Sequence, residues 1–210
     1  MNVFPGGLII TRVEYQCLQY LTVDPAQWLI DTLHEKAQHR RDALITEQLP
    51  RLLTDPSIRD IPANSDVLAE LIMSRADYVT REQADTARNP LERMAHRNID
   101  RFEARRVVGE RVTLFPAGLE ITDLEHASIM AYIQDLDDWL LGALLGQINR
   151  GKKKIIRQYR PVLFDDPTVL SMPADDDDLV ALIVQRADYR TLPEQIQERG
   201  ARRDADTKRT

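Results

Sequence analysis

The residues best suited to chemistry are two histidines, a run of aspartates and a single cysteine. His34 and His39 lie in His34-Glu35-Lys36-Ala37-Gln38-His39, which superficially resembles the His-Glu-x-x-His signature of zinc proteases. In that signature the histidines are four residues apart and share one face of a helix. A spacing of five places them about 140° apart around the helix axis. We therefore predict surface histidines here and no metal site.

The aspartate run, Asp175 to Asp178, could attract a divalent cation, but it lacks the alternating spacing and distal glutamate of a calcium-binding loop. Acidic residues at the start of a helix are stabilised by its dipole, so we predict that the run caps a helix. Cys17 has no recurring histidine partner and is predicted to be a small core residue. Gly142 and Gly146 predict close helix packing. Together these features predict no catalytic group, no metal ion and no cofactor.

Basic residues supply the candidate binding sites. Arginines at every fourth position around residues 93–105 would form one stripe on a helix, and a lysine cluster lies further along the chain. These candidates are Arg93, Arg97, Arg101, Arg105, Lys152, Lys153 and Lys154. Three interpretations stay open, namely a solvated surface, an acidic protein partner and a nucleic acid. The net charge of −6 and the pI of about 5.3 disfavour nucleic acid.

Composition favours a soluble, non-enzymatic protein of one or two domains. The chain has 210 residues, of which 43% are hydrophobic and 30% charged, so it can bury a core. A single cysteine excludes a disulfide framework and a cysteine-based zinc site. The sequence has no apolar run of the ~18 residues that span a membrane and no signal-peptide pattern at its N-terminus. We expect a cytosolic location with no membrane association.

The sequence matches itself at a constant shift of 111 positions. Phe4-Pro5-Gly6-Gly7-Leu8-Ile9-Ile10-Thr11 aligns with Phe115-Pro116-Ala117-Gly118-Leu119-Glu120-Ile121-Thr122, and Trp28 aligns with Trp139. Arg75-Ala76-Asp77-Tyr78 aligns with Arg186-Ala187-Asp188-Tyr189. We interpret the tyrosine of this motif as an anchor on the core and its charges as caps or pairs; a docking corner is the alternative. The constant shift predicts a tandem duplication.

We accordingly divide the sequence into a first repeat (1–83), a charged connector helix (84–112), a second repeat (113–196) and a charged flexible tail (197–210). Each repeat begins with a short strand or extended arm. A capping box follows at Thr11 and Glu14, and again at Thr122 and Glu125. We predict helices over 12–22 and 123–133, long helices that end near Pro50 and Pro161, and third helices over 65–75 and 176–186. Further capping spacings at Thr80 and Thr191 predict a short helix at the end of each repeat.

The predicted fold class is therefore mainly α, with two tandem copies of a three-to-four-helix unit. A lone strand cannot satisfy its own backbone, so it must pair with the sister repeat or with another chain. The side chains that would accompany such pairing with a partner's sheet are Leu8, Ile10, Leu119 and Ile121.

The repeat outline resembles a group of phage proteins. It consists of Ile10-Thr11, an aromatic-rich short helix, Asp24-Pro25-Ala26-Gln27-Trp28, Asp55-Pro56 and Ile61-Pro62-Ala63. This pattern is similar to small helical proteins encoded among the structural genes of tailed bacteriophages, here doubled. The second repeat departs from it at Leu136, where the first has Pro25.

The resemblance implies a non-enzymatic structural or adaptor protein of the virion, at the tail, the neck or the capsid surface. Its partners would be other phage structural proteins, in a homo-oligomer or in many copies within an assembly. It would be found in the virion, and in the host cytoplasm during assembly. The alternatives are a regulatory or nucleic-acid-associated helical protein that uses the arginine stripe, and a phage assembly chaperone.

Overall fold

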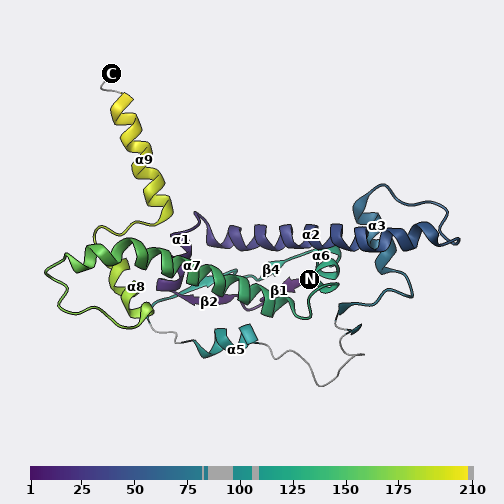
Figure 1. Ribbon diagram of the computed structural model, residues 1–210, viewed down its shortest axis with the longest axis horizontal. Helices are drawn as coiled ribbons and strands as arrows, with labels where there is room; N and C mark the ends of the chain where they lie inside the picture. Colours follow the sequence, from purple (N-terminus) through teal and green to yellow (C-terminus); the bar gives the residue numbers. More distant parts are fainter. Residues whose placement is uncertain (82, 85–96, 106–108, 208–210) are drawn as a thin grey trace. The chain divides into compact units, whose positions relative to one another are not determined.

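The computed structural model is mainly helical and describes residues 1–81, 83–84, 97–105 and 109–207 (Figure 1). In chain order the elements are β1 (Asn2–Val3), β2 (Leu8–Thr11), α1 (Arg12–Gln19), α2 (Pro25–Thr54), α3 (Ser65–Met73), α5 (Arg97–Ala104), β3 (Arg111–Leu114), β4 (Leu119–Glu120), α6 (Asp123–Met130), α7 (Leu136–Phe164), α8 (Asp176–Val184) and α9 (Leu192–Thr207). The mainly helical fold class is confirmed. Among the described helices, none combines the length and the apolar character needed to cross a bilayer.

The chain forms two compact units, and each takes segments from both halves of the sequence. Unit 1 consists of Met1–Gly7, Leu29–Arg105 and Phe115–Gly142, and unit 2 of Leu8–Trp28, Arg106–Leu114 and Ala143–Thr210. The units therefore differ from the continuous ranges 1–83 and 113–196 of the sequence repeats.

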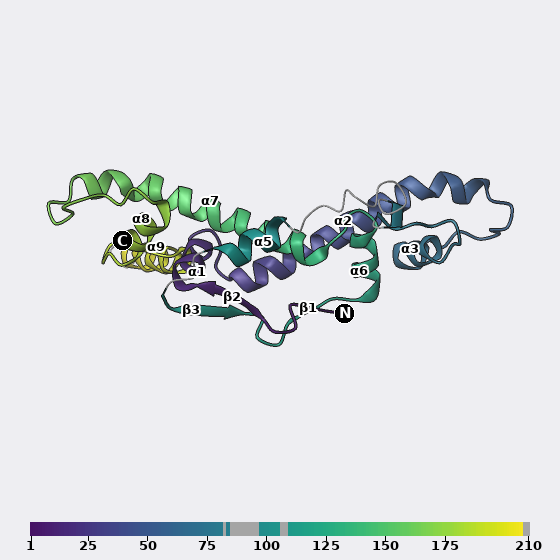
Figure 2. The ribbon, with the colours of Figure 1, turned by 90° about the horizontal axis from the view of Figure 1, so that it is seen from below.

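In unit 1, β1 pairs antiparallel with β4, with Val3 opposite Leu119. The amino group of Met1 extends this pairing by donating a hydrogen bond to the carbonyl of Ile121 at 2.8 Å. Helix α6 packs on α3 (Figure 2). The core beneath contains Leu44, Leu52, Leu68 and Ile72.

In unit 2, β2 pairs antiparallel with β3, with Leu8 opposite Leu114 and Ile10 opposite Val112. Helix α1 follows β2 directly and packs on α8. Ile155, Leu163, Leu179 and Ile183 are buried in this unit. Each of them lies 111 positions after one of the four core residues of unit 1, so the same sequence positions build both cores.

The strand pairings of the two units are also equivalent under the shift of 111. Val3 and Leu119 are opposite each other in unit 1, and their counterparts, Leu114 and Leu8, are opposite each other in unit 2. In the same way, α6 packs on α3 where α1 packs on α8. The short helix near the start of each repeat thus packs on the third helix of the other repeat.

Local sequence explains how these elements begin. Both predicted capping boxes are present, because Thr11 and Glu14, and likewise Thr122 and Glu125, exchange side-chain and backbone hydrogen bonds. The aspartate run caps α8 as predicted, since the carboxylate of Asp175 accepts from the amides of Asp177 and Asp178.

The Phe-Pro motifs form tight turns. The amide of Gly7 donates to the carbonyl of Phe4, and that of Gly118 to the carbonyl of Phe115, each at 2.8 Å. Gly7 and Gly118 have φ of +76° and +85°, a region that glycine adopts without a steric penalty.

Several boundaries differ from the predictions. Helices α1, α3, α6 and α8 each end two or three residues before their predicted ends, and three differences are larger. First, α2 continues past Pro50 to Thr54, and α7 continues past Pro161 to Phe164. Proline removes one helical hydrogen bond. However, Leu52 and Leu163, each two residues further along, are only 2% exposed, so core packing holds the last turn.

Second, the segment 197–210, predicted as a flexible tail, is helical as far as Thr207, because α9 continues through it. The ion pair between Arg190 and Glu198, at 2.7 Å, links this helix to the loop before it. Third, Arg111 and Val112 belong to β3 although the connector helix was predicted to include them. Residues 85–96 and 106–108 of the predicted connector lie outside the described residues.

Candidate functional site

The predicted arginine stripe falls on α5, which Arg97 opens, whereas Arg93 lies outside the described residues. Arg101 is exposed. Arg105 instead folds over the ring of Phe102, with its guanidinium carbon 3.3 Å from the ring centroid, and donates to the carbonyl of Phe102. The guanidinium of Arg105, the residue after α5, is therefore engaged by the last turn of that helix.

The lysine cluster lies on α7, and its first member is already paired. Lys152 forms an ion pair with Asp177 in the first turn of α8. Its counterpart in unit 1, Arg41, forms the same ion pair with Asp66 in the first turn of α3.

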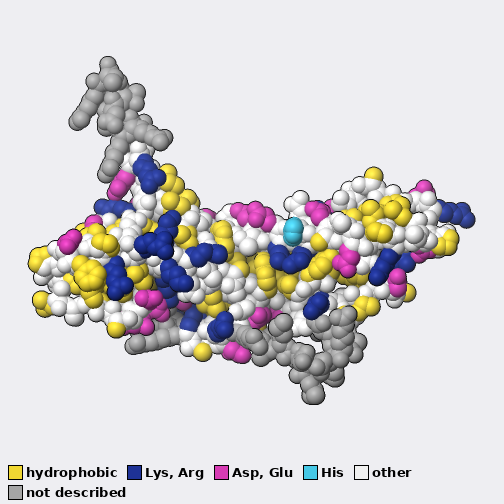
Figure 3. Space-filling model, in the orientation of Figure 1, with side chains coloured by type: hydrophobic (Ala, Val, Ile, Leu, Met, Phe, Trp, Pro, Cys, Tyr) yellow, Lys and Arg dark blue, Asp and Glu magenta, His cyan; other side chains and the backbone are white. Residues whose placement is uncertain are grey.

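The other two lysines, Lys153 and Lys154, are exposed, and the amino group of Lys154 lies 5.7 Å from the centroid of the Tyr20 ring. Basic side chains gather over α7 in the space-filling view (Figure 3). Lys153 and Lys154 therefore contribute to a basic surface on α7, whereas the charge of Lys152 is paired with Asp177.

The four strand residues predicted to meet a partner are all buried within the chain. Leu8, Ile10, Leu119 and Ile121 are at most 5% exposed. The backbones of β2 and β4 pair with β3 and β1. These side chains therefore contribute to the cores of the units.

The repeated Arg-Ala-Asp-Tyr motif forms the same hydrogen-bond network twice. In unit 1, Arg75 donates to the carboxylates of Asp55 and Asp77, each at 2.8 Å. Asp55 also accepts from the amide and hydroxyl of Ser57. These hydrogen bonds, chiefly those from Ser57, lower the pKa of Asp55 to about 2. The network fastens the end of α3 to the loop after α2.

In unit 2, Arg186 joins Asp166 and Asp188 in the same way, and Asp166 accepts from Thr168. The pKa of Asp166 is likewise lowered to about 2, chiefly by its hydrogen bond from the Thr168 hydroxyl. The charges of the motif therefore pair, as predicted.

The two histidines and the cysteine lie in different surroundings. The Nδ1 atom of His34 lies 2.6 Å from a carboxylate oxygen of Glu125, and His39 is exposed. Within the described residues, no group of three or more histidine, cysteine, aspartate or glutamate side chains could hold a metal ion. Cys17 is buried in unit 2, and burial raises the pKa of its thiol to about 12.

The glycine pair has two outcomes. A Cβ at Gly142 would lie 2.6 Å from the side-chain amide nitrogen of Asn98, so α5 packs closely there as predicted. A Cβ at Gly146 would meet no atom of the described residues within 4 Å, so no close packing is found among them at that position.

Three tyrosine rings pack together in unit 2. The ring centroid of Tyr189 lies 6.1 Å from that of Tyr20 and 5.8 Å from that of Tyr159. All three residues are at most 6% exposed. Each hydroxyl donates a hydrogen bond, and Tyr189 donates to the carbonyl of Gln16 at 3.1 Å. The cluster is thus a filled and satisfied part of the core.

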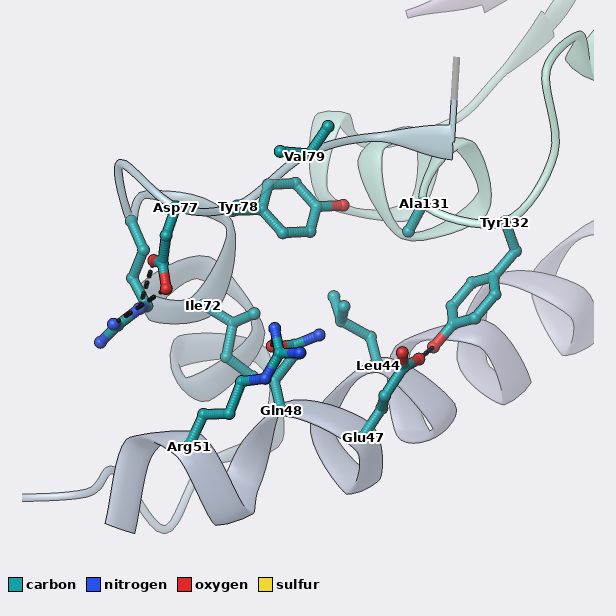
Figure 4. Close-up of a pocket in the computed structure, with 11 residues that line it drawn as sticks. Leu44, Glu47, Gln48, Arg51, Ile72, Asp77, Tyr78, Val79, Ala131 and Tyr132 are labelled. Atoms are coloured by element: carbon teal, nitrogen blue, oxygen red, sulfur yellow. Dashed lines mark hydrogen bonds and ion pairs between the residues drawn. The ribbon is translucent and has the colours of Figure 1, made fainter. Parts of the chain in front are cut away.

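Unit 1 has a cavity of about 250 Å³ at the corresponding place (Figure 4). Tyr78, the counterpart of Tyr189, lines it. The other two tyrosines are replaced at their counterpart positions, Tyr20 by Ala131 and Tyr159 by Gln48. The remaining lining residues include Leu44, Glu47, Arg51, Ile72, Arg75, Asp77, Val79 and Tyr132.

Polar side chains are among the residues that line this cavity. The buried hydroxyl of Tyr78 has no hydrogen-bond partner among the described residues. The guanidinium of Arg51 donates to the side-chain oxygen of Gln48 at 3.4 Å. On the far side, Tyr132 donates to Glu47 at 3.2 Å (Figure 4).

Sequence reasoning missed this cavity, although the signal was present. The repeat alignment pairs Tyr20 with Ala131 and Tyr159 with Gln48, so each of these two pairs keeps its aromatic ring in only one of its members. No family model, curated protein or solved structure matches this chain.

Proposed function

We propose that this protein is a non-enzymatic structural or adaptor protein of a tailed bacteriophage virion, at the tail, the neck or the capsid surface. The chain is a tandem duplication of a three-to-four-helix unit, with the charged connector between its copies. The observation that carries the proposal is that equivalent residues build two units with the same strand pairing and helix packing.

The proposed mechanism is geometric. Two similar units offer two similar surfaces, and such surfaces suit neighbours related by symmetry or near-symmetry in an assembly. Unit 1 takes β4 and α6 from the second half of the sequence. Unit 2 takes β2 and α1 from the first half. Each unit therefore needs both halves of the chain in order to fold.

The resemblance of the repeat to phage structural proteins indicates which assembly the protein joins and which partners it has there. These are other structural proteins of the particle, which the protein meets in many copies or as a homo-oligomer. It is found in the virion, and in the host cytoplasm during assembly.

Quantitative mass spectrometry on purified particles tests this proposal, with the chain measured against the major capsid protein. We expect a fixed stoichiometric ratio, and its value would assign a capsid, neck or tail position. If the chain is absent from particles but abundant in infected cells, the structural role is wrong and an assembly chaperone becomes the better proposal.

A regulatory or nucleic-acid-associated role is the second candidate, favoured by the exposed Arg101, Lys153 and Lys154. Binding through these residues would release counterions, so it would weaken steeply as salt rises. Gel-shift measurements at low salt, with the triple variant Arg101→Gln, Lys153→Gln and Lys154→Gln beside wild type, test this role. Absence of any shift would remove it.

A further inference from the structure

We propose that the cavity in unit 1 binds one phenol ring, the side chain of a tyrosine that a protein partner supplies. The residues that line the cavity indicate the chemistry of the ring. Its source, a partner protein, rests on the adaptor role proposed above.

Unit 2 shows which shape fits beside the conserved tyrosine position. There, Tyr20 and Tyr159 place their rings against Tyr189. In unit 1 the rings are missing at both positions, yet Tyr78 remains. An apolar cavity of about 150 Å³ is large enough to bind benzene, and the cavity beside Tyr78 measures about 250 Å³. It therefore has room for a single ring.

Tyr132, the residue after Ala131, does not replace the missing ring. Its hydroxyl donates to Glu47, the counterpart of the residue that accepts from Tyr20 in unit 2. Its ring lies beneath the guanidinium of Arg40, whose central carbon is 4.9 Å from the ring centroid. Tyr132 thus takes over the hydrogen bond of Tyr20, while the cavity beside Tyr78 stays open.

The hydroxyl of Tyr78 favours a ligand that can form a hydrogen bond. A buried hydroxyl without a partner is unfavourable, and the equivalent hydroxyl of Tyr189 donates to a carbonyl at 3.1 Å. A phenol can both donate and accept a hydrogen bond. A tyrosine in the cavity would therefore satisfy Tyr78, which a phenylalanine could not do.

The charges around the cavity favour a neutral ring. Two acids, Glu47 and Asp77, and two bases, Arg51 and Arg75, line it, so their formal charges cancel. Arg75 and Asp77 pair with each other at 2.8 Å. A tyrosine side chain is neutral at pH 7, and an ionised ligand would gain no net attraction from this lining.

The first test uses 4-methylphenol, which is the tyrosine side chain without its backbone, and the full-length protein. We expect saturable binding at one site in calorimetry or in two-dimensional NMR, with shifts at Ala131 and Tyr78. Ala131→Tyr fills the cavity as Tyr20 fills unit 2, and should weaken binding at least tenfold. Gln38→Tyr adds a tyrosine at an exposed position of α2 and should leave binding unchanged. Unsaturable binding to wild type, or equal binding to Ala131→Tyr, would overturn the proposal.

Tyr78→Phe tests the hydrogen bond separately from the shape. Wild type should bind 4-methylphenol more tightly than toluene, which has the same ring without a hydroxyl, and Tyr78→Phe should remove most of this preference. An unchanged preference in the variant would overturn the assigned role of the Tyr78 hydroxyl.

Incorporation into particles distinguishes the source of the ring. If a partner supplies a tyrosine, Ala131→Tyr should enter particles less efficiently than Gln38→Tyr. Equal incorporation of the two variants, together with lost 4-methylphenol binding, would overturn the partner as the source. Absence of wild type from particles is a different result, because it would contradict the virion role and leave the ring chemistry of the cavity standing.

Discussion

Gly151 of α7 lies directly against the carbonyl oxygen of Cys17 in α1. A Cβ at position 151 would come within 2.2 Å of that oxygen and within 2.8 Å of its carbon. The two helices can pack this closely only because residue 151 has no side chain. Gly151 stands between the basic residues Arg150 and Lys152. The sequence around it therefore indicates a charged surface and does not indicate a packing role.

Gly151→Ala is therefore expected to destabilise the protein, because a backbone atom cannot move aside as a flexible side chain can. Overpacking of this kind costs about 1–3 kcal/mol. Gly146→Ala, on the same helix, is the matched control, since its Cβ would have no described atom within 4 Å. The control should be neutral or more stable by up to about 1 kcal/mol, from helix propensity. Urea unfolding of the two variants measures the difference, and equal stability would contradict the close packing of α1 on α7.

The stability of the protein should fall in acid through Asp55 and Asp166. The pKa of each carboxyl is lowered in the folded protein from 3.8 to about 2. Because the folded state disfavours the protonated form, the hydrogen-bonded carboxylates contribute stability above about pH 4. That contribution is lost as the pH falls from about 4 to about 2.

A double variant isolates this effect. Asp55→Asn with Asp166→Asn should be less stable than wild type at pH 7, and its stability should depend less on pH between 4 and 2. Asp60→Asn, a change at an exposed aspartate, is the control and should keep the slope of wild type. Thermal unfolding at a series of pH values provides the measurement. A double variant with the slope of wild type would show that the two networks do not carry the acid sensitivity.

Cys17 should resist thiol reagents in the native protein. It is fully buried, and burial raises its pKa to about 12, so at pH 8 little reactive thiolate is present. We expect labelling with a chromogenic disulfide to be slow in buffer and rapid in denaturant, where the thiol recovers an ordinary pKa of about 8.5. Labelling of the native protein at the denatured rate would mean that α1 is not packed as described.

Features coded by residues close together in the sequence were the most predictable. The capping boxes at Thr11 and Thr122 need only a glutamate three residues further on, and both formed as predicted. The ends of α2 and α7 were less predictable, because the buried Leu52 and Leu163 outweigh the prolines before them.

The candidate site could be predicted only in part, because it depends on contacts between distant residues. The unsatisfied backbone of a lone strand indicated that β2 needs a partner, but nothing near Leu8 specifies that the partner is β3. The cavity requires Gln48 of α2, Tyr78 and Ala131 to face one another. Their spacing in the sequence does not contain that information, although the lost rings at two repeat positions point to it.

The pairing of β2 with β3 within one chain is the basis for two equivalent units, and a designed disulfide tests it most directly. Ile9 and Thr113 are directly opposite each other in this pairing, and both are exposed. Opposed residues of antiparallel strands have Cα atoms about 4.5–5.5 Å apart, a separation that a disulfide can span. After mild oxidation, Ile9→Cys with Thr113→Cys should form a crosslink within a single chain, which peptide mapping by mass spectrometry would identify. Failure to crosslink, or crosslinks only between chains, would contradict the intrachain pairing and the two units built on it.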